Sequence, residues 1–312
     1  MCYAPYDEMY RKALKVFENT QVQNPIEHKL IKDVLKKRKP DIHKGSCGRL
    51  MVCAGSAGLT GAAYMACEAA LRTGAGLVTL CCAEQLNSIF EIKLTEAMTL
   101  PVKSRKGVIS AKAFGDICKK LESSDALLYG PGLTQCRDIK ILLKKILKFT
   151  KVPVVIDADG INVLSENKDI LKETSAPVIL TPHIGEFARL TGYDTGFILE
   201  NYKKLALEFA KEYGIILVLK SHKTVVTDGK QIFENVLGNP GMAVGGSGDV
   251  LSGIIASFLA QGNSPFLSAL GGVYIHSLAG DMASFETGEY SLLPRDIIRY
   301  ISYAVRESSL KD

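Results

Sequence analysis

The sequence lacks several features that would assign it to a specialised class. It contains no Cys-x-x-Cys pair and no His-Glu-x-x-His motif, and its five histidines lie far apart, so no zinc ligands can be recognised. No apolar run approaches the roughly 20 residues needed to cross a bilayer, so no membrane association is expected. No secretory signal is recognisable either, and we expect the eight cysteines to be reduced and mostly buried in a cytoplasmic protein.

The chain also lacks a strong charge of either sign. Its 38 basic and 33 acidic side chains leave a formal net charge of +5. No Arg- or Lys-rich tract alternates with aromatic residues, which argues against nucleic acid as a partner. The one dense basic stretch, residues 36–39 (KKRK), follows an amphipathic segment, and we interpret it as a solvated helix end.

The order of apolar and polar residues along the chain predicts the fold class. Of the 312 residues, 47% are hydrophobic. From residue 49 onward, short apolar runs without polar alternation are separated by longer segments of helical period. Such runs are typical of parallel strands covered on both faces, so we predict an α/β fold with a doubly wound, mostly parallel sheet. The expected strands are 49–54, 76–82, 126–130, 152–157, 177–181 and 215–220, and the expected helices are 60–73, 109–121, 137–149, 199–213, 249–261, 265–286 and 294–308.

Two segments depart from this alternation. Residues 224–236 contain two strand-like runs around Asp228-Gly229, which predicts an antiparallel hairpin at one edge of the sheet. Residues 1–25 are polar and tyrosine-rich without a recognisable pattern. We therefore expect an N-terminal appendage over 1–25 and a single domain over 26–312.

The segment 238–249 (GNPGMAVGGSGD) carries the strongest chemical signal. Its glycines allow several backbone N–H groups to approach one anion, and the helix expected to follow would add its N-terminus to a phosphate site. Asp249 would repel a phosphate there, which makes sense if it takes a proton from an attacking hydroxyl. The alternative is that Asp249 only caps the helix after a glycine-rich turn.

Two familiar nucleotide-binding motifs are absent. Gly229-Lys230 is followed by Gln, so the Walker lysine pattern is missing and a P-loop NTPase is excluded. Residues 55–61 (GSAGLTG) open a helix after a strand, but their glycine spacing differs from the dinucleotide-binding fingerprint. No acidic residue ends the next strand, so a Rossmann dehydrogenase is not favoured.

Polar side chains follow three of the predicted strands at their carboxyl ends, the edge where such sheets bind ligands. Asp157 and Asp159 are placed to hold hydrated magnesium, although an Asx-type turn explains the same residues equally well. Residues 181–189 and 220–224 follow the next two strands in the same way.

The order and spacing of these segments make the chain similar to the ADP/ATP-dependent NAD(P)H-hydrate dehydratase family of the ribokinase superfamily. The resemblance runs from residue 43 to about residue 298 and implies a ribokinase-like fold. The segments that carry it are 43–48 (HKGSCG), 55–62 (GSAGLTGA), 130–133 (GPGL), 157–162 (DADGIN), 181–187 (TPHIGEF) and 238–249.

This resemblance implies a metabolite-repair lyase. Such an enzyme uses ADP or ATP to phosphorylate the hydroxyl of the S form of hydrated NADH or NADPH, and loss of phosphate then restores the nicotinamide ring. By the family pattern, Asp249 is the catalytic base and contacts the substrate together with Ala62, Gly132 and His183. Magnesium is expected as a bridging ion, with no protein ligand assigned to it. The expected nucleotide-binding residues are Lys220, Ser221, His222, Lys223, Thr224, Asn239, Gly245, Gly246, Ser247 and Gly248, and the amides of 245–248 would stabilise the transferred phosphoryl group.

The resemblance carries further expectations. Thr134 and Ser221 stand where glycine is common, and Ser247 stands where threonine is frequent. The family tendency implies a homotetramer, with residues 62–71 and 254–260 as candidate interfaces, and an NAD(P)H-hydrate epimerase is expected as a separate protein. We expect residues 1–25 to be peripheral to the catalytic crevice. The sequence does not indicate whether ADP or ATP, or which of the two hydrates, is preferred.

Two other functions fit parts of the pattern. A vitamin-precursor kinase of the same superfamily shares the Gly-x-Gly-Asp loop and keeps its phosphorylated product, but residues 43–45 and 181–187 favour the dehydratase. A regulatory module that binds a nucleotide without turnover would also carry the glycine loop, and the presence of Asp249 argues against it.

Overall fold

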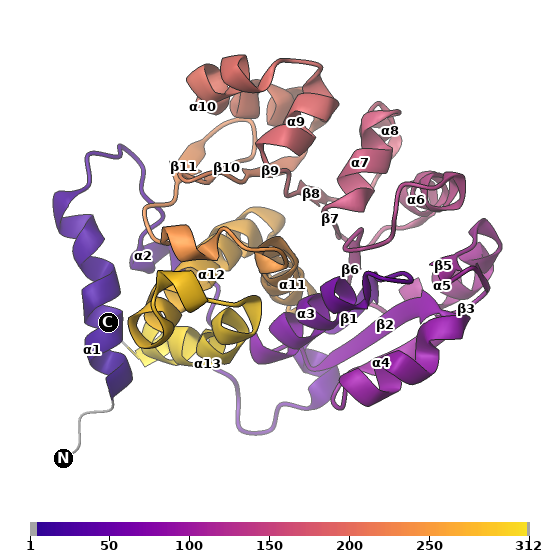
Figure 1. Cartoon of the computed structure of the whole chain (residues 1–312), viewed down its shortest axis with the longest axis horizontal. Coiled ribbons are helices and arrows are strands. Elements are labelled where there is room, and N and C mark those ends of the chain that lie inside the picture. The colour runs from indigo at the N-terminus through magenta and orange to yellow at the C-terminus, as the bar shows by residue number, and fades with distance from the viewer. Residues whose placement is uncertain (1–4, 311–312) are drawn as a thin grey trace.

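One mostly parallel sheet organises the chain, whose computed structural model describes residues 5–310. The strands of this sheet are β1 (Arg49–Cys53), β2 (Leu77–Ala83), β3 (Met98–Val102), β6 (Ala126–Tyr129), β7 (Val154–Ile156), β8 (Val178–Leu180), β9 (Ile216–Leu219), β10 (Val225–Thr227) and β11 (Ile232–Glu234). Their spatial order is β11-β10-β9-β8-β7-β6-β1-β2-β3 (Figure 1). Every pairing from β9 to β3 is parallel, and β10 and β11 form the antiparallel edge hairpin that the sequence predicts.

Helices cover both faces of this sheet (Figure 1). One layer holds α3 (Thr60–Arg72), α11 (Ser247–Ala260), α12 (Pro265–Thr287) and α13 (Pro294–Leu310), and the other holds α5 (Phe114–Leu121), α6 (Arg137–Phe149), α7 (Asp159–Ser165), α8 (Ile170–Glu173), α9 (Ile184–Thr191) and α10 (Thr195–Tyr213). The short helix α4 (Asn87–Lys93) joins β2 to β3. The doubly wound α/β architecture is therefore confirmed. Short 3₁₀ turns cover Lys15–Asn19, Lys44–Cys47, Glu84–Leu86, Ala111–Ala113, Pro240–Met242 and Glu289–Ser291, and a small separate hairpin pairs β4 (Ser104–Arg105) with β5 (Val108–Ile109).

The local sequence explains why these elements form. The strands β6, β7 and β8 are buried at every position, as expected for strands with a helix layer on each side. In α6 the buried residues recur at helical spacing, for example Ile139, Leu142 and Ile146, so one stripe faces the sheet. In α11 nearly every side chain is buried because α3, α12 and the sheet surround it. The segment 254–260 therefore lies inside the protomer, and the expectation that it supplies a subunit interface is wrong.

The packing of α11 on α3 depends on the absence of a side chain at Gly253. A Cβ atom at Gly253 of α11 would lie 2.4 Å from the carbonyl oxygen of Ala66 in α3. Glycine therefore allows the two backbones to pack against one another directly.

The N-terminal stretch has more structure than the sequence suggests. Helix α1 (Pro5–Leu14) packs on α12 and α13, and Tyr10 is only 2% exposed. Residues 24–26 then run beside the sheet edge, where Ile26 N donates to Glu234 O at 3.0 Å and Glu234 N donates to Asn24 O at 2.9 Å. Another short helix, α2 (His28–Ile31), follows and contacts α12. The signal for α1 was the helical spacing of Tyr6, Tyr10 and Ala13, which the polar composition obscured.

Strand β3 was also not predicted. Its sequence, MTLPV, contains Pro101, and proline cannot donate to a central sheet ladder. The structure resolves the conflict because β3 lies at the edge and pairs only with β2 in this sheet. The helix expected over 109–121 begins later, at Phe114, because a strand and a 3₁₀ turn occupy residues 108–113.

Within residues 5–310 no helix is both long enough and apolar enough to cross a membrane. The seven cysteines of this range are free thiols, and all of them except Cys136 are buried.

The turn after β6 contains a residue in an unusual conformation. Thr134 has a φ angle of 69°, in the left-handed region that disfavours a residue with a Cβ atom. Its hydroxyl is buried without a hydrogen-bond partner among the described residues. The glycine that the resemblance leads us to expect at this position would adopt this conformation without strain.

We predict that Thr134→Gly stabilises the protein. It removes the left-handed strain and the unpaired hydroxyl, and after the higher entropy of the unfolded glycine chain is subtracted we expect a gain of about 0.5–1 kcal/mol. Thermal unfolding followed by circular dichroism should show a melting temperature raised by a few degrees. Thr150→Gly is the matched control, because Thr150 has an ordinary φ of −75° and should lose stability. If the melting temperature of Thr134→Gly is unchanged or lower, the left-handed conformation of Thr134 does not cost stability and the prediction is wrong.

Candidate active site

The topological switch point of the sheet lies at β1, which has β2 on one side and β6 on the other. Sheets of this kind bind ligands outside the carboxyl ends of the strands at this point, and we call this region the crevice. The two loops at this point are joined, because Gly55 N donates to Pro131 O at 2.8 Å. A Cβ atom at Gly132 would lie 3.1 Å from the Cβ of Ala62. Ala62 and Gly132, both expected to contact the substrate, are thus neighbours in the structure.

Asp157, directly after β7, is the centre of a buried polar network. Its side chain is 1% exposed, and its Oδ1 accepts hydrogen bonds from Thr181 Oγ1 at 2.7 Å and from Lys220 Nζ at 2.8 Å. The other carboxylate oxygen, Oδ2, is buried and has no partner among the described residues. A buried acceptor without a partner is costly, so this oxygen is suited to a ligand that reaches the base of the crevice.

Asp159, two residues on, has a structural role. Its oxygens accept hydrogen bonds from Thr134 N at 2.8 Å and from Gln135 Nε2 at 3.2 Å, which fixes the turn after β6. These bonds join Asp159 to a distant turn and do not form an Asx-type turn within residues 157–162, so neither of the two interpretations of Asp157 and Asp159 follows from them. No cluster of three or more metal-ligating side chains occurs in the part of the chain that the structure describes.

Lys220 connects the strand ends to the glycine-rich loop. Its backbone N–H donates to Pro182 O at 2.8 Å, which places it beside the turn that contains His183. A Cβ atom at Gly248 would lie 3.2 Å from Lys220 Nζ, so the ammonium group lies against the first turn of α11. Burial alone would lower the pKa of Lys220, but the carboxylates of Asp157 and Glu186 outweigh it and raise this pKa above its usual value.

His183 and Glu186 cap helix α9. His183 Nδ1 accepts from Gly185 N at 3.0 Å and from Glu186 N at 3.3 Å, and Glu186 Oε2 accepts from His183 N at 2.8 Å. Burial raises the pKa of Glu186 to about 7, and Asp157 adds to this shift. Burial and the charge of Lys220 lower the pKa of His183, so this imidazole is neutral at physiological pH.

The N-terminus of α11 forms a concave backbone surface. Gly246 has a φ angle of 101°, and a Cβ atom there would lie 2.5 Å from the methyl carbon of Met65. Gly245, Gly246 and Gly248 have no backbone acceptor for their N–H groups within residues 5–310, whereas Ser247 N donates to Val244 O at 3.2 Å. The Ser247 hydroxyl contacts His276 Nε2 of α12 at 3.2 Å. The glycine amides are thus available to an anion, and Ser247 instead holds the loop in place.

Asp249 lies in the first turn of α11, beside this surface. Burial raises its pKa to about 7, and the negative charge of Asp157 raises it further while Lys220 opposes the shift. A carboxylate with this pKa exchanges its proton easily near neutral pH, which is what a general base requires. The N-cap residue of α11 is Gly246, and no side chain makes a capping hydrogen bond there, so the alternative that Asp249 only caps the helix is wrong.

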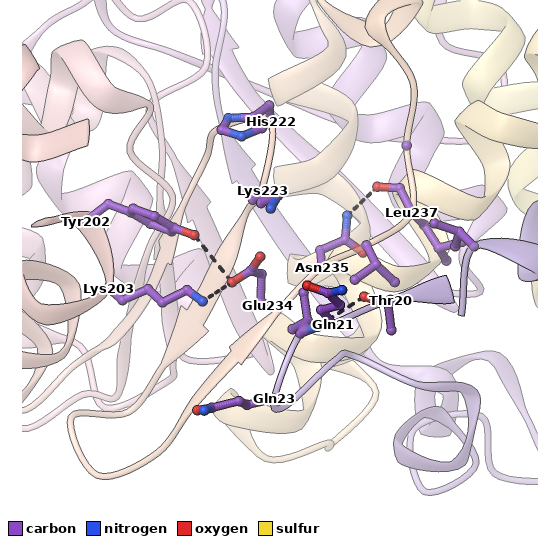
Figure 2. A pocket seen from close by; sticks show the side chains of 14 residues that line it. Thr20, Gln21, Gln23, Tyr202, Lys203, His222, Lys223, Glu234, Asn235 and Leu237 are labelled. Atoms are coloured by element: carbon purple, nitrogen blue, oxygen red, sulfur yellow. Dashed lines mark hydrogen bonds and ion pairs between the residues drawn. The ribbon is translucent and has the colours of Figure 1, made fainter. Parts of the chain in front are cut away.

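The remaining candidate nucleotide residues lie in the turn after β9 and at the start of the glycine-rich loop. Ser221 and Thr224 close a turn through the bond from Thr224 Oγ1 to Ser221 O at 3.1 Å. His222 and Lys223, at the tip of this turn, line a cavity of about 890 Å³ (Figure 2). Asn239 Nδ2 donates to Asp281 Oδ1 at 2.9 Å, so the start of the glycine-rich loop is anchored to α12.

Two supporting residues were missed by reasoning from the sequence. Asp281 and His276 both belong to α12, a mostly apolar helix, and hold the two ends of the loop 238–249. Burial raises the pKa of Asp281 and lowers that of His276 to about 4. Ionisable residues inside a mostly apolar helix were the available signal, because such residues are usually paired when buried.

Comparison with known proteins is consistent with this geometry. The family model described as NAD(P)H-hydrate dehydratase matches residues 50–303. The chain is 39% identical over 275 residues to the bifunctional NAD(P)H-hydrate repair enzyme of Moorella thermoacetica, covering 87% of this chain and 52% of that protein. It is 30% identical over 267 residues to the ADP-dependent (S)-NAD(P)H-hydrate dehydratase of Listeria monocytogenes, covering 84% of this chain and 89% of that protein. The chain therefore spans about half the length of the bifunctional relative and most of the monofunctional one.

A solved structure extends the likeness to three dimensions. The ADP/ATP-dependent NAD(P)H-hydrate dehydratase of Bacillus subtilis, co-crystallised with ATP and Mg²⁺, superposes with a TM-score of 0.78 at 26% identity, covering 92% of this chain and 99% of that one. The ribokinase-like fold is thus confirmed. The vitamin-precursor kinase alternative shares this fold but not the family match. The chain belongs to the NAD(P)H-hydrate dehydratase family.

Proposed function

We propose that this protein is an ADP- or ATP-dependent dehydratase that repairs the S form of hydrated NADH or NADPH. The observation that carries the proposal is the position of Asp249. This carboxyl group, with a pKa of about 7, lies in the same helical turn as glycine amides that suit a phosphate and close to the Lys220 ammonium. A base beside a phosphate site suits the activation of a hydroxyl for phosphoryl transfer.

The chemistry follows from these groups. Asp249 takes the proton of the hydroxyl on the hydrated ring, and the oxygen attacks the terminal phosphoryl group of the nucleotide. AMP leaves if ADP is the donor, and ADP leaves if ATP is the donor. The amides of Gly245, Gly246 and Gly248 and the charge of Lys220 stabilise the negative charge that develops. Inorganic phosphate then departs with a ring proton and restores the double bond, because phosphate is a far better leaving group than hydroxide.

The two ligands would occupy opposite parts of the crevice. The hydrated nicotinamide nucleotide would lie over the loops after β1, β6 and β8, against Ala62, Gly132 and His183. The adenine nucleotide would lie over residues 220–224 and the loop 239–248. Support for this division comes from the contacts that join Ala62 to Gly132 on one side and from the cavity beside His222 and Lys223 on the other.

Magnesium fits this site only together with a bound nucleotide. Mg²⁺ is usually held by one or two carboxylates and by substrate phosphates, with water completing its shell. Asp157 offers a buried oxygen without a partner, and Asp249 is the other carboxylate beside the phosphate surface. When bound, the ion would neutralise part of the phosphate charge.

The location, the oligomeric state and the partner enzyme are also proposals. We propose a cytoplasmic homotetramer that acts alongside a separate NAD(P)H-hydrate epimerase. Support for the second activity comes from the Moorella thermoacetica relative, which is named bifunctional and of which this chain matches about half.

The first test is a direct assay of the purified protein. Hydrated NADH should regain its near-ultraviolet absorbance only when magnesium and ADP or ATP are present, with release of inorganic phosphate. No recovery of absorbance, with ATP consumed on a thiazole or pyrimidine alcohol instead, would assign the protein to the vitamin-precursor kinases.

The role of Asp249 is tested by Asp249→Asn. Loss of a general base typically lowers the rate by ~10²–10⁴-fold, so kcat should fall by that factor while nucleotide affinity stays within about tenfold. The matched control is Asp116→Asn, which changes an exposed carboxylate in the first turn of α5 and should leave kcat unchanged. Full activity of Asp249→Asn would remove the residue from the mechanism.

The raised pKa of Asp249 predicts two pH dependences. Only the ionised carboxylate accepts a proton, so kcat should rise with pH through about 7 and then level off. Because the folded-state pKa lies above the unfolded value, ionisation destabilises the fold as pH rises from about 4 to 7. Asp249→Asn should therefore melt at a higher temperature than the wild type at pH 8, and the difference should vanish at pH 4. An equal difference at both pH values would show that the carboxyl is not perturbed.

A further inference from the structure

The cavity beside the 220–224 turn has a wall that the family resemblance does not account for. His222, Lys223 and Gly238 line this cavity of about 890 Å³. Val16 and residues 20–23 of the N-terminal segment line it as well. Figure 2 shows His222 and Lys223 at the top of the cavity and Thr20, Gln21 and Gln23 in its lower half. The volume falls within the range of pockets that hold nucleotide-sized ligands.

The segment that forms this wall is fixed at both ends. Before it, α1 is docked on the C-terminal helices, with the rings of Tyr6 and Tyr303 stacked at a centroid distance of 3.7 Å. After it, residues 24–26 hydrogen-bond to Glu234 of β11. The segment lies outside residues 50–303, which match the family model. It is therefore a positioned part of the fold, supplied by sequence that the family match does not include.

The charges in the cavity indicate which part of a nucleotide fits there. Glu234 is 3% exposed, and it forms an ion pair with Lys203 and accepts a hydrogen bond from Tyr202 OH at 3.3 Å. Lys203 neutralises this carboxylate, so Lys223, beside His222, supplies the remaining charge among the lining residues that the structure describes. The side chains of Gln21 and Gln23 are polar and uncharged, with donors and acceptors that suit a base or a ribose. The phosphates have their own site at the glycine amides of α11.

We propose that the segment Val16–Gln23 closes the nucleoside end of the adenine nucleotide site and that Gln21 and Gln23 contribute to the affinity for ADP and ATP. This inference rests on the proposed function, because it requires the nucleotide to extend from the glycine-rich loop over His222 and Lys223. It differs from the expectation that residues 1–25 are peripheral to the catalytic crevice, and the experiment below decides between the two.

The test is a double substitution, Gln21→Ala with Gln23→Ala. Both side chains are exposed, so their removal leaves the core intact. Thr20 is left unchanged, because its hydroxyl accepts a hydrogen bond from Val22 N at 3.3 Å and shapes the segment. The matched control is Lys15→Ala with Glu18→Ala, two exposed residues of the same stretch that do not line the cavity and whose joint removal keeps the net charge.

Isothermal titration calorimetry with ADP and with ATP gives the readout. We expect the dissociation constants to rise roughly tenfold in the glutamine variant, as loss of one or two neutral hydrogen bonds implies, and to stay at the wild-type value in the control. In the hydrate assay, KM for the nucleotide should rise in parallel, while KM for the hydrate and kcat stay unchanged.

The outcomes separate this inference from the proposed function. If the wild-type protein turns over the hydrate but the glutamine variant binds ADP and ATP as tightly as the wild type, the wall has no role and the inference is wrong. Equal weakening in the control variant also overturns it, because the effect is then not local to the cavity. If the wild type binds neither nucleotide, the proposed function fails and the inference fails with it.

Discussion

A single half-buried ammonium group, that of Lys220, stabilises the arrangement of carboxyl groups in the crevice. Burial raises the pKa values of Glu186 and Asp249 to about 7, and the nearby charge of Asp157 adds to both shifts. Lys220 opposes both shifts and hydrogen-bonds to Asp157. Breaking a buried ion pair by removing one partner typically costs about 3–5 kcal/mol, because the remaining charge is left uncompensated. The positive charge of Lys220 thus stabilises the carboxylates at the strand ends and lies against the first turn of α11, beside the glycine-rich loop.

The carboxyl groups around Lys220 have different roles. Asp157 is tied to Lys220 and Thr181, Asp159 fixes a turn, and Glu186 caps α9. Asp249 is the member that remains beside the glycine amides with a pKa suited to proton transfer at neutral pH. The chemistry we propose depends on this difference in surroundings, since all of these groups are carboxylic acids with similar pKa values in water.

Much of this could be predicted from the sequence. The sheet strands around the crevice, the edge hairpin and the glycine-rich loop before α11 have strong local signals: apolar runs, an Asp-Gly turn and clustered glycines. The interpretation of Asp157 and Asp159 could not be decided, because magnesium binding and turn formation use the same residue type at the same place. Helix α1 and the cavity wall formed by Val16–Gln23 were missed because contacts with α12, α13 and β11 hold them in place. These elements are distant in sequence. Strand β3 was missed because Pro101 is compatible only with an edge position that the sequence does not reveal.

The direct packing of α3 on α11 has a consequence for the alignment of the two reactants. Ala62 lies one helical turn before Ala66 in α3, and Asp249 lies one turn before Gly253 in α11. The contact between Ala66 and Gly253 therefore joins the two helices one turn below the proposed substrate contact and the proposed base. In the proposed mechanism, the distance from Asp249 to the reacting hydroxyl therefore depends on two rigid backbones in direct contact. A methyl group added at Gly253 would push these helices apart and change that distance, although it would touch neither ligand.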